Sequence, residues 1–228
     1  MQKYEIEIKS LLGSKENADK LKENLVKHGY DIGSAKKSSQ LNHYFSYSGQ
    51  EVLNNFKTNF SKIISSEKLE EFNKILEIGK DFSIRTRESN GTKVILVVKA
   101  SLDAGTSANG VSRAEFEEVL PMTLEELDQK LLESGLEHQA KWSRDREEFV
   151  GTSITVCLDK NAGYGYLAEF ETVTEDKKEV ENVKKELEKF MQDVDCAELQ
   201  QDRLARMFDF YNKNWAEYYG TDKIFNIE

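Results

Sequence analysis

Alternation of polar and apolar residues predicts strands along most of the chain. Residues Tyr4 to Lys9 alternate strictly, which is typical of a strand with one buried face. The same two-residue period predicts further strands at about 41–46, 82–87, 93–99, 111–120, 138–149, 153–159 and 166–173. The run Glu88 to Gly91 joins two of these strands and consists of turn-forming residues, so it predicts a hairpin.

Helical spacing of apolar residues predicts helices before, between and after these strands. A helix is expected at about 18–28, and an inserted helical hairpin at about 50–80, whose aromatic residues we expect on the outside of the sheet. Thr123 is followed three residues later by Glu126, a capping box that opens a helix to Glu133. The tail from about 176 to 218 also has helical spacing.

About eight strands with short connections favour antiparallel neighbours in a closed or nearly closed sheet. The predicted fold class is therefore α+β, an eight-stranded antiparallel β-barrel with flanking helices. We expect a single domain over 1–228, with a helical insertion at about 50–80 and a helical C-terminal tail at about 176–228.

Composition narrows the possible partners. The chain has 42 acidic and 32 basic residues, a net charge of −10, which argues against a broad basic surface for nucleic acid. The longest apolar run, Val94 to Val98, is too short to span a membrane, and Met1 to Lys9 does not resemble a signal peptide. Two cysteines without a CxxC motif suggest a reducing compartment. We expect a cytoplasmic monomer or homodimer without nucleic-acid or membrane partners.

Charged residues gather on the polar side of six predicted strand segments. The acidic members are Glu5, Glu7, Glu115, Glu117, Asp159, Glu169 and Glu171. The basic members are Lys9, Arg85, Arg87, Lys99, Arg113, Arg144 and Arg146. A solvated face would explain any one strand, but their accumulation indicates that the charges point into the barrel. Carboxylates suit Mg²⁺ or Mn²⁺, and arginines suit phosphate, so a metal with a phosphate chain satisfies both sets.

The order of these motifs resembles that of the CYTH superfamily, the triphosphate tunnel metalloenzymes. Glu5 to Lys9 matches the family's ExExK signature. The other similar segments, in chain order, are Asn42 to Phe45, Ser83 to Arg87, Val97 to Lys99, Arg113 to Glu117, Arg144 to Phe149 and Asp159 to Glu171. Together they span residues 4 to about 173. The resemblance implies an eight-stranded antiparallel barrel that forms a tunnel, with helices outside.

The resemblance also implies chemistry on a small-molecule triphosphate with Mg²⁺ or Mn²⁺ as cofactor. Glu5, Glu7, Glu169 and Glu171 would hold metal, with Asp159, Glu115 and Glu117 assisting, and Glu5, Glu7 and Lys9 would form the catalytic set. The phosphates would be bound by Lys9, Arg85, Arg87, Lys99, Arg113, Arg144 and Arg146. Three activities fit: a triphosphatase acting on tripolyphosphate or an organic or nucleoside triphosphate, a class IV adenylyl cyclase making cyclic AMP and pyrophosphate from ATP, and a non-catalytic polyphosphate- or nucleotide-binding module.

Three positions depart from the family pattern. Asn42 stands where an aspartate is usual, Arg144 where a lysine is usual, and Val97 where a threonine is usual. Arg144 keeps its charge, whereas Asn42 lacks one. The inserted helices and the tail lie outside the motifs, and either pack on the barrel exterior or shape one tunnel mouth.

Overall fold

The computed structural model describes residues 4–101 and 113–228, and everything below concerns that part of the chain. Its strands are β1 (Tyr4–Gly13), β2 (Lys36–Ser46), β3 (Lys80–Ser89), β4 (Lys93–Ser101), β5 (Arg113–Leu120), β6 (Glu137–Val150), β7 (Thr155–Asn161) and β8 (Gly165–Thr174). Its α-helices are α1 (Lys15–Lys27), α2 (Gln50–Phe60), α3 (Leu69–Ile78), α4 (Leu124–Glu133), α5 (Val180–Asp193) and α6 (Gln201–Tyr218). None of these helices is long and apolar enough to cross a membrane.

The strands follow the order β1-β5-β4-β3-β2-β6-β7-β8. This is the eight-stranded antiparallel topology with flanking helices that the sequence predicts, so the predicted fold class is confirmed. The described residues divide into two compact units, which interleave along the chain. Unit 1 comprises residues 4–39 and 143–228, and unit 2 comprises 40–101 and 113–142.

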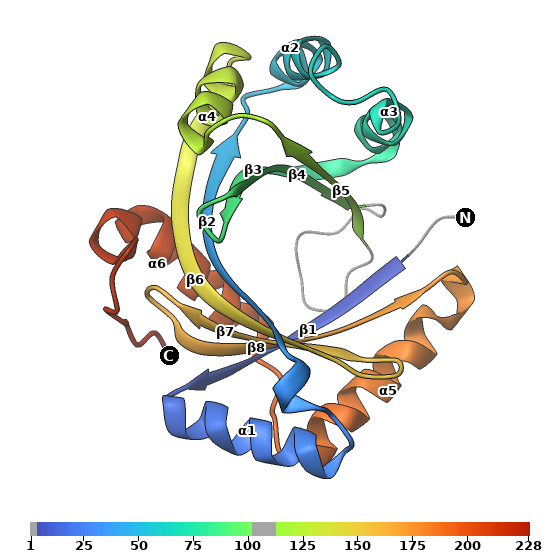
Figure 1. Cartoon of the computed structure of the whole chain (residues 1–228), viewed down its shortest axis with the longest axis vertical. Helices are drawn as coiled ribbons and strands as arrows, with labels where there is room; N and C mark the ends of the chain where they lie inside the picture. Colours follow the sequence, from blue (N-terminus) through green and yellow to red (C-terminus); the bar gives the residue numbers. More distant parts are fainter. Residues whose placement is uncertain (1–3, 102–112) are drawn as a thin grey trace. The chain divides into compact units, whose positions relative to one another are not determined.

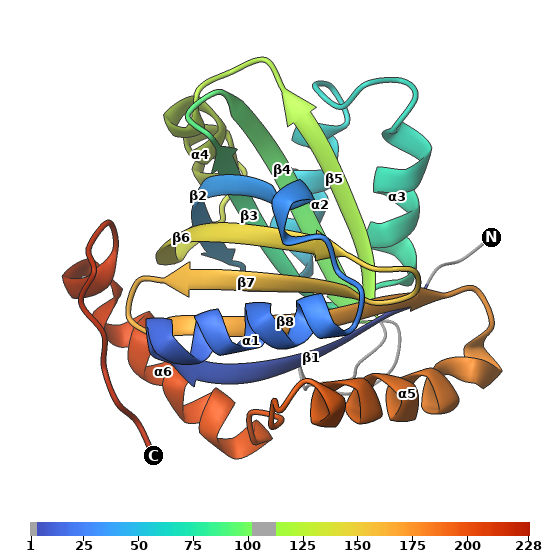
Figure 2. The ribbon, with the colours of Figure 1, turned by 60° about the horizontal axis from the view of Figure 1, so that its bottom comes forward.

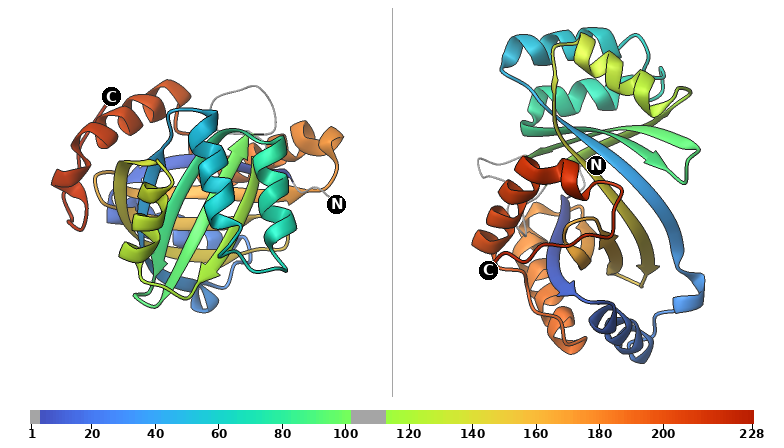
Figure 3. Two further views of the ribbon diagram at one scale, coloured as in Figure 1. Left: turned by 90° about the horizontal axis from the view of Figure 1, so that it is seen from above. Right: turned by 90° about the vertical axis from the view of Figure 1, so that its left-hand side faces the viewer.

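Unit 2 is a sheet of β2, β3, β4 and β5 with α2, α3 and α4 on one face (Figures 1 and 3). Phe56 and Phe60 of α2 and Phe72 of α3 are fully buried, and Phe72 packs on Phe116 of β5 at 5.2 Å between ring centroids. The expected packing of the inserted aromatic residues against the sheet is therefore confirmed. The predicted hairpin joins β3 to β4 through Asn90 and a glycine, which both have positive φ angles.

A buried polar network ties α4 to the same sheet. The predicted capping box is present, with Thr123 and Glu126 bonding each other's backbone amides. One turn further on, the Asp128 carboxylate accepts a hydrogen bond from the Thr86 hydroxyl at 2.6 Å. Its other oxygen lies 2.6 Å from Nδ1 of His43. All three side chains are buried, and the Asp128 carboxylate supplies a polar partner to both of the others.

Replacing Asp128 by asparagine is expected to lower the free energy of unfolding by about 1–2 kcal/mol. The amide keeps the shape of the carboxylate but loses the charge that strengthens both contacts. Urea unfolding monitored by circular dichroism measures the change. Asp209→Asn, on the exposed surface of α6, is the matched control and should stay within about 0.5 kcal/mol; an equal loss in both variants would contradict the prediction.

Unit 1 is a sheet of β1, β8, β7 and the second half of β6, from residue 143. Helices α1 and α5 run along one side of it (Figure 2). Ile6 and Ile8 of β1 and Phe170 of β8 are fully buried on this side. They pack with Leu21 of α1 and Leu187 of α5 in one hydrophobic cluster. The alternate residues of these strands consequently point to the opposite face.

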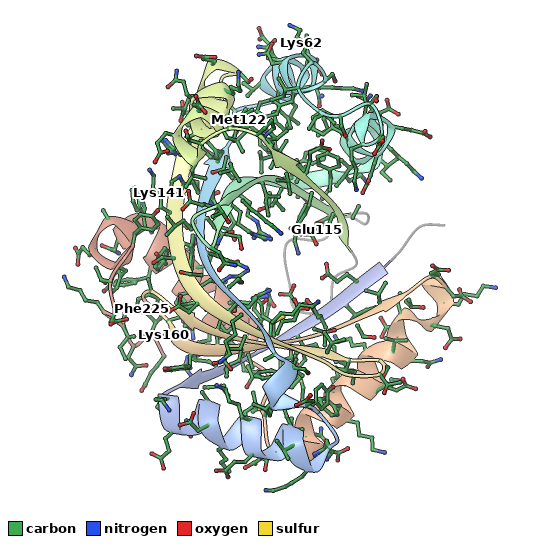
Figure 4. All side chains as sticks on the ribbon, viewed as in Figure 1. Lys62, Glu115, Met122, Lys141, Lys160 and Phe225 are labelled. Carbon is green, nitrogen blue, oxygen red and sulfur yellow. The ribbon has the colours of Figure 1, made fainter. Side chains whose placement is uncertain are left out.

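The C-terminal tail is not one continuous helical region. Helix α5 ends at Asp193 and α6 starts at Gln201, and Asp195 between them has a φ of 62°. The linker instead bonds to β1, since the amide of Leu199 donates to the carbonyl of Lys9 at 2.7 Å. After α6 the chain turns back, and the amide of Phe225 donates a hydrogen bond to the carbonyl of Gly163. Figure 4 labels Phe225 beside α6.

Candidate active site

The polar face of unit 1 carries eight of the charged residues singled out in the sequence. Strand pairing places Glu7 opposite Glu171 and Lys9 opposite Glu169 on β1 and β8. On β6 and β7, Arg146 lies opposite Asp159. Because side chains alternate along a strand, all of these residues lie on the face opposite the hydrophobic cluster. They are Glu5, Glu7, Lys9, Arg144, Arg146, Asp159, Glu169 and Glu171.

Three carboxylates at one end of this face form a group with the geometry of a metal site. Oxygens of Glu5, Glu7 and Glu171 all lie within 4.8 Å of one another. Glu7 also pairs with the ammonium group of Lys9. Clustered carboxylate oxygens are the donors that Mg²⁺ and Mn²⁺ prefer. The residues present therefore fit the divalent metal that the family resemblance implies.

Further along the face, two other predicted metal ligands are engaged by basic side chains. Asp159 has no exposed surface and accepts two hydrogen bonds from Arg146, at 2.6 and 2.7 Å. Arg144 reaches the same carboxylate at 2.8 Å. Glu169 contacts Arg146 and lies 3.3 Å from Nζ of Lys9. These two carboxylates thus act here as partners that fix the basic side chains in place.

Electrostatics keep Glu169 ionised despite its burial. Burial alone would raise the pKa of this carboxyl, but Lys9, Arg146 and Arg144 outweigh it and hold the pKa well below the usual 4.5. The ionised form is therefore stabilised by folding. A carboxyl with a depressed pKa contributes stability above its unfolded pKa, and this contribution is lost as the pH falls through the folded pKa.

Glu169→Gln is accordingly expected to be less stable than the wild type at pH 7, and the difference is expected to shrink progressively below about pH 4.5. Urea unfolding in EDTA at a series of pH values from 7 to 3 measures it. A difference that stays constant, or grows, on acidification would contradict the assigned ion pairs.

Unit 2 presents a second charged face, on the side of the sheet away from its helices. Arg85 donates to the Tyr44 hydroxyl at 2.6 Å and lies 3.9 Å from Glu115. Figure 4 labels Glu115, on the face of β5 away from α2 and α3. Lys99 lies 3.2 Å from the other oxygen of Glu115. Arg87 donates to Glu117 at 2.8 Å. The predicted residues of unit 2 therefore also form ion pairs on one face.

The departures at Asn42 and Val97 both lie on this second face. The Asn42 side-chain oxygen accepts a hydrogen bond from Nε of Arg87 at 3.0 Å, so this asparagine orients the guanidinium without adding charge. Val97 is fully buried opposite Arg85. Burial raises the pKa of Glu115, but Lys99 and Arg85 outweigh it and lower the pKa overall. Arg113 lies opposite Ser101 on β5, and its side chain is outside the described part of the chain.

Several residues that the sequence motifs did not single out share these faces. Thr155 and Cys157 lie opposite Glu171 and Glu169 on β7. The Cys157 thiol donates to Glu171 at 3.9 Å, and burial raises its pKa, so it stays a neutral donor. Tyr44, by contrast, belongs to the motif segment Asn42 to Phe45, and it contacts Arg85 in unit 2. Thr155 and Cys157 lie two apart from each other and from Asp159 along one strand, and this two-residue period could have placed them on the face of Asp159.

Comparisons with known proteins agree on the fold. The family model described as the CYTH domain matches residues 78–203, more than half of the chain. A Vibrio parahaemolyticus structure named "putative adenylate cyclase" superposes with a TM-score of 0.61 at 13% identity, covering 92% of this chain and 99% of that one. The PH1819 protein from Pyrococcus horikoshii OT3 gives a TM-score of 0.59 at 21% identity, covering 86% and 93%. At these identities the structures share the fold alone. No curated protein matches the sequence.

Proposed function

Because the chain belongs to the CYTH domain family, we propose that it is a divalent-metal-dependent triphosphatase. The observation that carries this proposal is the group formed by Glu5, Glu7 and Glu171, whose oxygens lie within 4.8 Å of one another. Lys9 and two arginines lie on the same face of unit 1. Phosphoryl transfer uses a divalent metal ion, which carboxylate oxygens can hold, and basic side chains that bind the phosphate oxygens.

In the proposed reaction the side chains bind and orient the phosphates. Glu5, Glu7 and Glu171 would hold Mg²⁺ or Mn²⁺, which neutralises phosphate charge and lowers the pKa of bound water. Lys9, Arg144 and Arg146 would bind phosphate oxygens and stabilise the charge of the transition state. The oxygen of water bonds to the terminal phosphorus as the P–O anhydride bond breaks, giving phosphate and a shortened chain. Arg85, Arg87 and Lys99 of unit 2 are proposed as further phosphate-binding residues.

The contacts of Lys9, Arg144 and Arg146, which we call the basic cluster, support their proposed role in phosphate binding. The network of Arg144, Arg146, Asp159 and Glu169 is held by short contacts within the fold. The arginines are therefore positioned before a ligand arrives, which reduces the cost of ordering them on binding. Arg146 is almost enclosed, and its pKa lies well above the usual value because Glu169 and Asp159 outweigh the effect of burial. Its positive charge is present at every physiological pH.

Product analysis tests the proposal. The protein is incubated with Mg²⁺ or Mn²⁺ and, separately, with tripolyphosphate, thiamine triphosphate and ATP, and all products are identified. We expect phosphate release that EDTA abolishes. Cyclic AMP with pyrophosphate from ATP would instead make it an adenylyl cyclase, the activity in the name of the similar Vibrio parahaemolyticus protein. Tight binding of a triphosphate without turnover in either metal would make it a binding module.

A further inference from the structure

A hollow of about 510 Å³ lies beside the group formed by Glu5, Glu7 and Glu171 in unit 1. This volume is in the range of small-molecule binding sites. The side chains and backbone around it come from the ends of β6 and β8, the start of β7 and the turn between β6 and β7. Its lining residues are Glu5, Val150, Gly151, Thr152, Ser153, Thr155, Glu171, Thr172 and Val173.

Strand register places two valines of the hollow on the charged face itself. Val150 lies opposite Thr155, and Thr155 lies opposite Glu171. Val173 lies opposite Glu5. Because opposite residues of antiparallel strands point to the same side, the valines continue the face that carries the metal-site carboxylates. Val150 and Val173 are 61% and 55% exposed, so their apolar surface is available to a bound molecule.

Acidic residues lie at the end of this face that adjoins the hollow, and the basic residues lie further along it. Among the described residues that line the hollow, the charged ones are Glu5 and Glu171. The backbone of Lys9 is four residues further along β1 than that of Glu5, about 13 Å at the rise of a strand, and its ammonium group contacts Glu7, which does not line the hollow. A metal ion held by these carboxylates would balance their charge, but a phosphate in the hollow would meet no basic side chain among the described lining residues. A phosphate chain is therefore favoured from the carboxylate group toward Lys9 and the arginines, and disfavoured in the hollow.

We propose that this hollow binds the organic group of the substrate, and that this group is uncharged or cationic. The substrate class is then an organic triphosphate in preference to inorganic tripolyphosphate. The apolar part of the group would pack on Val150 and Val173, and the hydroxyls of Thr152 and Thr155 would be its hydrogen-bonding partners. This inference rests on the proposed function, because it assumes that the phosphates lie on the charged face of unit 1.

Substitutions that fill the hollow should lower activity on organic triphosphates more than activity on inorganic tripolyphosphate. The value kcat/KM is measured for ATP, thiamine triphosphate and tripolyphosphate with the wild type, with Val173→Trp, and with Val150→Trp as a second variant. Both sites are more than half exposed, so tryptophan does not overpack a core. We expect the wild type to prefer one of the organic triphosphates, and each variant to lower that preference over tripolyphosphate about tenfold.

Val26→Trp is the matched control, because Val26 of α1 is also 55% exposed and lies on the other side of the unit 1 sheet. It should leave the preference unchanged. The inference is overturned if the wild type prefers tripolyphosphate, or if both hollow variants affect all three substrates equally. If nothing is turned over, the proposed function fails by itself. The same preference is then measured as a ratio of Kd values by calorimetry, and absence of triphosphate binding overturns the inference as well.

Discussion

Glu7→Gln is expected to lower kcat for the preferred triphosphate by about 10²–10³-fold, the usual effect of removing one group that stabilises transition-state charge. The substitution replaces a carboxylate of the group formed by Glu5, Glu7 and Glu171 with a neutral amide of the same shape. Glu7 lies directly opposite Glu171, so its removal also relieves a like-charge contact in the metal-free protein. The substitution also removes the ion pair of Glu7 with Lys9, which opposes this gain, so the variant should be about as stable as the wild type in EDTA.

Two measurements distinguish a metal ligand from a residue needed for folding. Initial rates with Mn²⁺ give the loss of activity, and thermal unfolding with and without Mn²⁺ gives the stabilisation by the bound ion. We expect Mn²⁺ to raise the melting temperature of the wild type and to have little effect on Glu7→Gln. Glu188→Gln, on the solvent side of α5, is the control and should resemble the wild type in both. A Glu7→Gln variant with nearly full activity and an unchanged response to Mn²⁺ would rule out the assigned role.

Arg146→Ala is expected to lower the free energy of unfolding by about 3–5 kcal/mol, the effect of breaking a buried ion pair from one side. Arg146 is the shared partner of Asp159 and Glu169. Without it, Asp159 keeps Arg144 and Glu169 keeps Lys9, but both carboxylates lose their closest cation. The pKa of Glu169 should also rise, because Arg146 is one of the groups that lower it.

Urea unfolding at pH 7 measures this loss of stability. Arg146→Lys should recover only part of it, because an ammonium group cannot make the paired contacts of the guanidinium with Asp159. Arg206→Ala removes an arginine from an exposed pair with Asp202 on α6 and is expected to change stability by less than about 1 kcal/mol. Equal losses at Arg146 and Arg206 would show that the buried network contributes nothing beyond a surface ion pair.

The elements that the sequence predicts best are those with a strong local signal. Strict alternation identifies β1, and the hairpin between β3 and β4 follows from its turn residues. The capping box at Thr123 and Glu126 fixes the start of α4 to the residue. In each case the interactions that form the element lie within a few residues of one another, so one sequence is sufficient to predict it.

The break between α5 and α6 lacks such a signal. Val194 continues the apolar spacing of Leu187 and Met191, and all three are buried. The linker that follows contains neither glycine nor proline. The helix ends in a local cap, in which Asp195 has a φ of 62° and the amide of Cys196 donates to the carbonyl of Met191. Tertiary contacts hold this end: Leu199 bonds to the backbone of β1, and Asn24 of α1 donates to the carbonyl of Val194. Contacts with residues far away in the sequence are not visible in local periodicity.

The same limit applies to the candidate site. Alternation shows which residues of a strand share a face, but register decides which of them meet. The sequence therefore groups Glu169 and Glu171 together, whereas the structure gives Glu169 basic partners and places Glu171 among carboxylates. Asp128 was missed because a helix usually exposes its acids. Its position between Leu124 and Leu131, on the buried stripe of α4, is the sign that it has partners inside.

The pairing of β1 with β8 sets an order of events during synthesis. Tyr4 pairs with Thr174, whereas the strands of unit 2 pair with neighbours in the chain. At ribosomal rates the ribosome needs on the order of ten seconds to make the intervening residues. Glu5 and Glu7 emerge first, yet they acquire Glu171 as a neighbour only after almost the whole barrel sequence has been translated. Nascent chains that end between Trp142 and the start of β8 therefore contain unit 2 in full but lack Glu171, the third member of the group formed with Glu5 and Glu7.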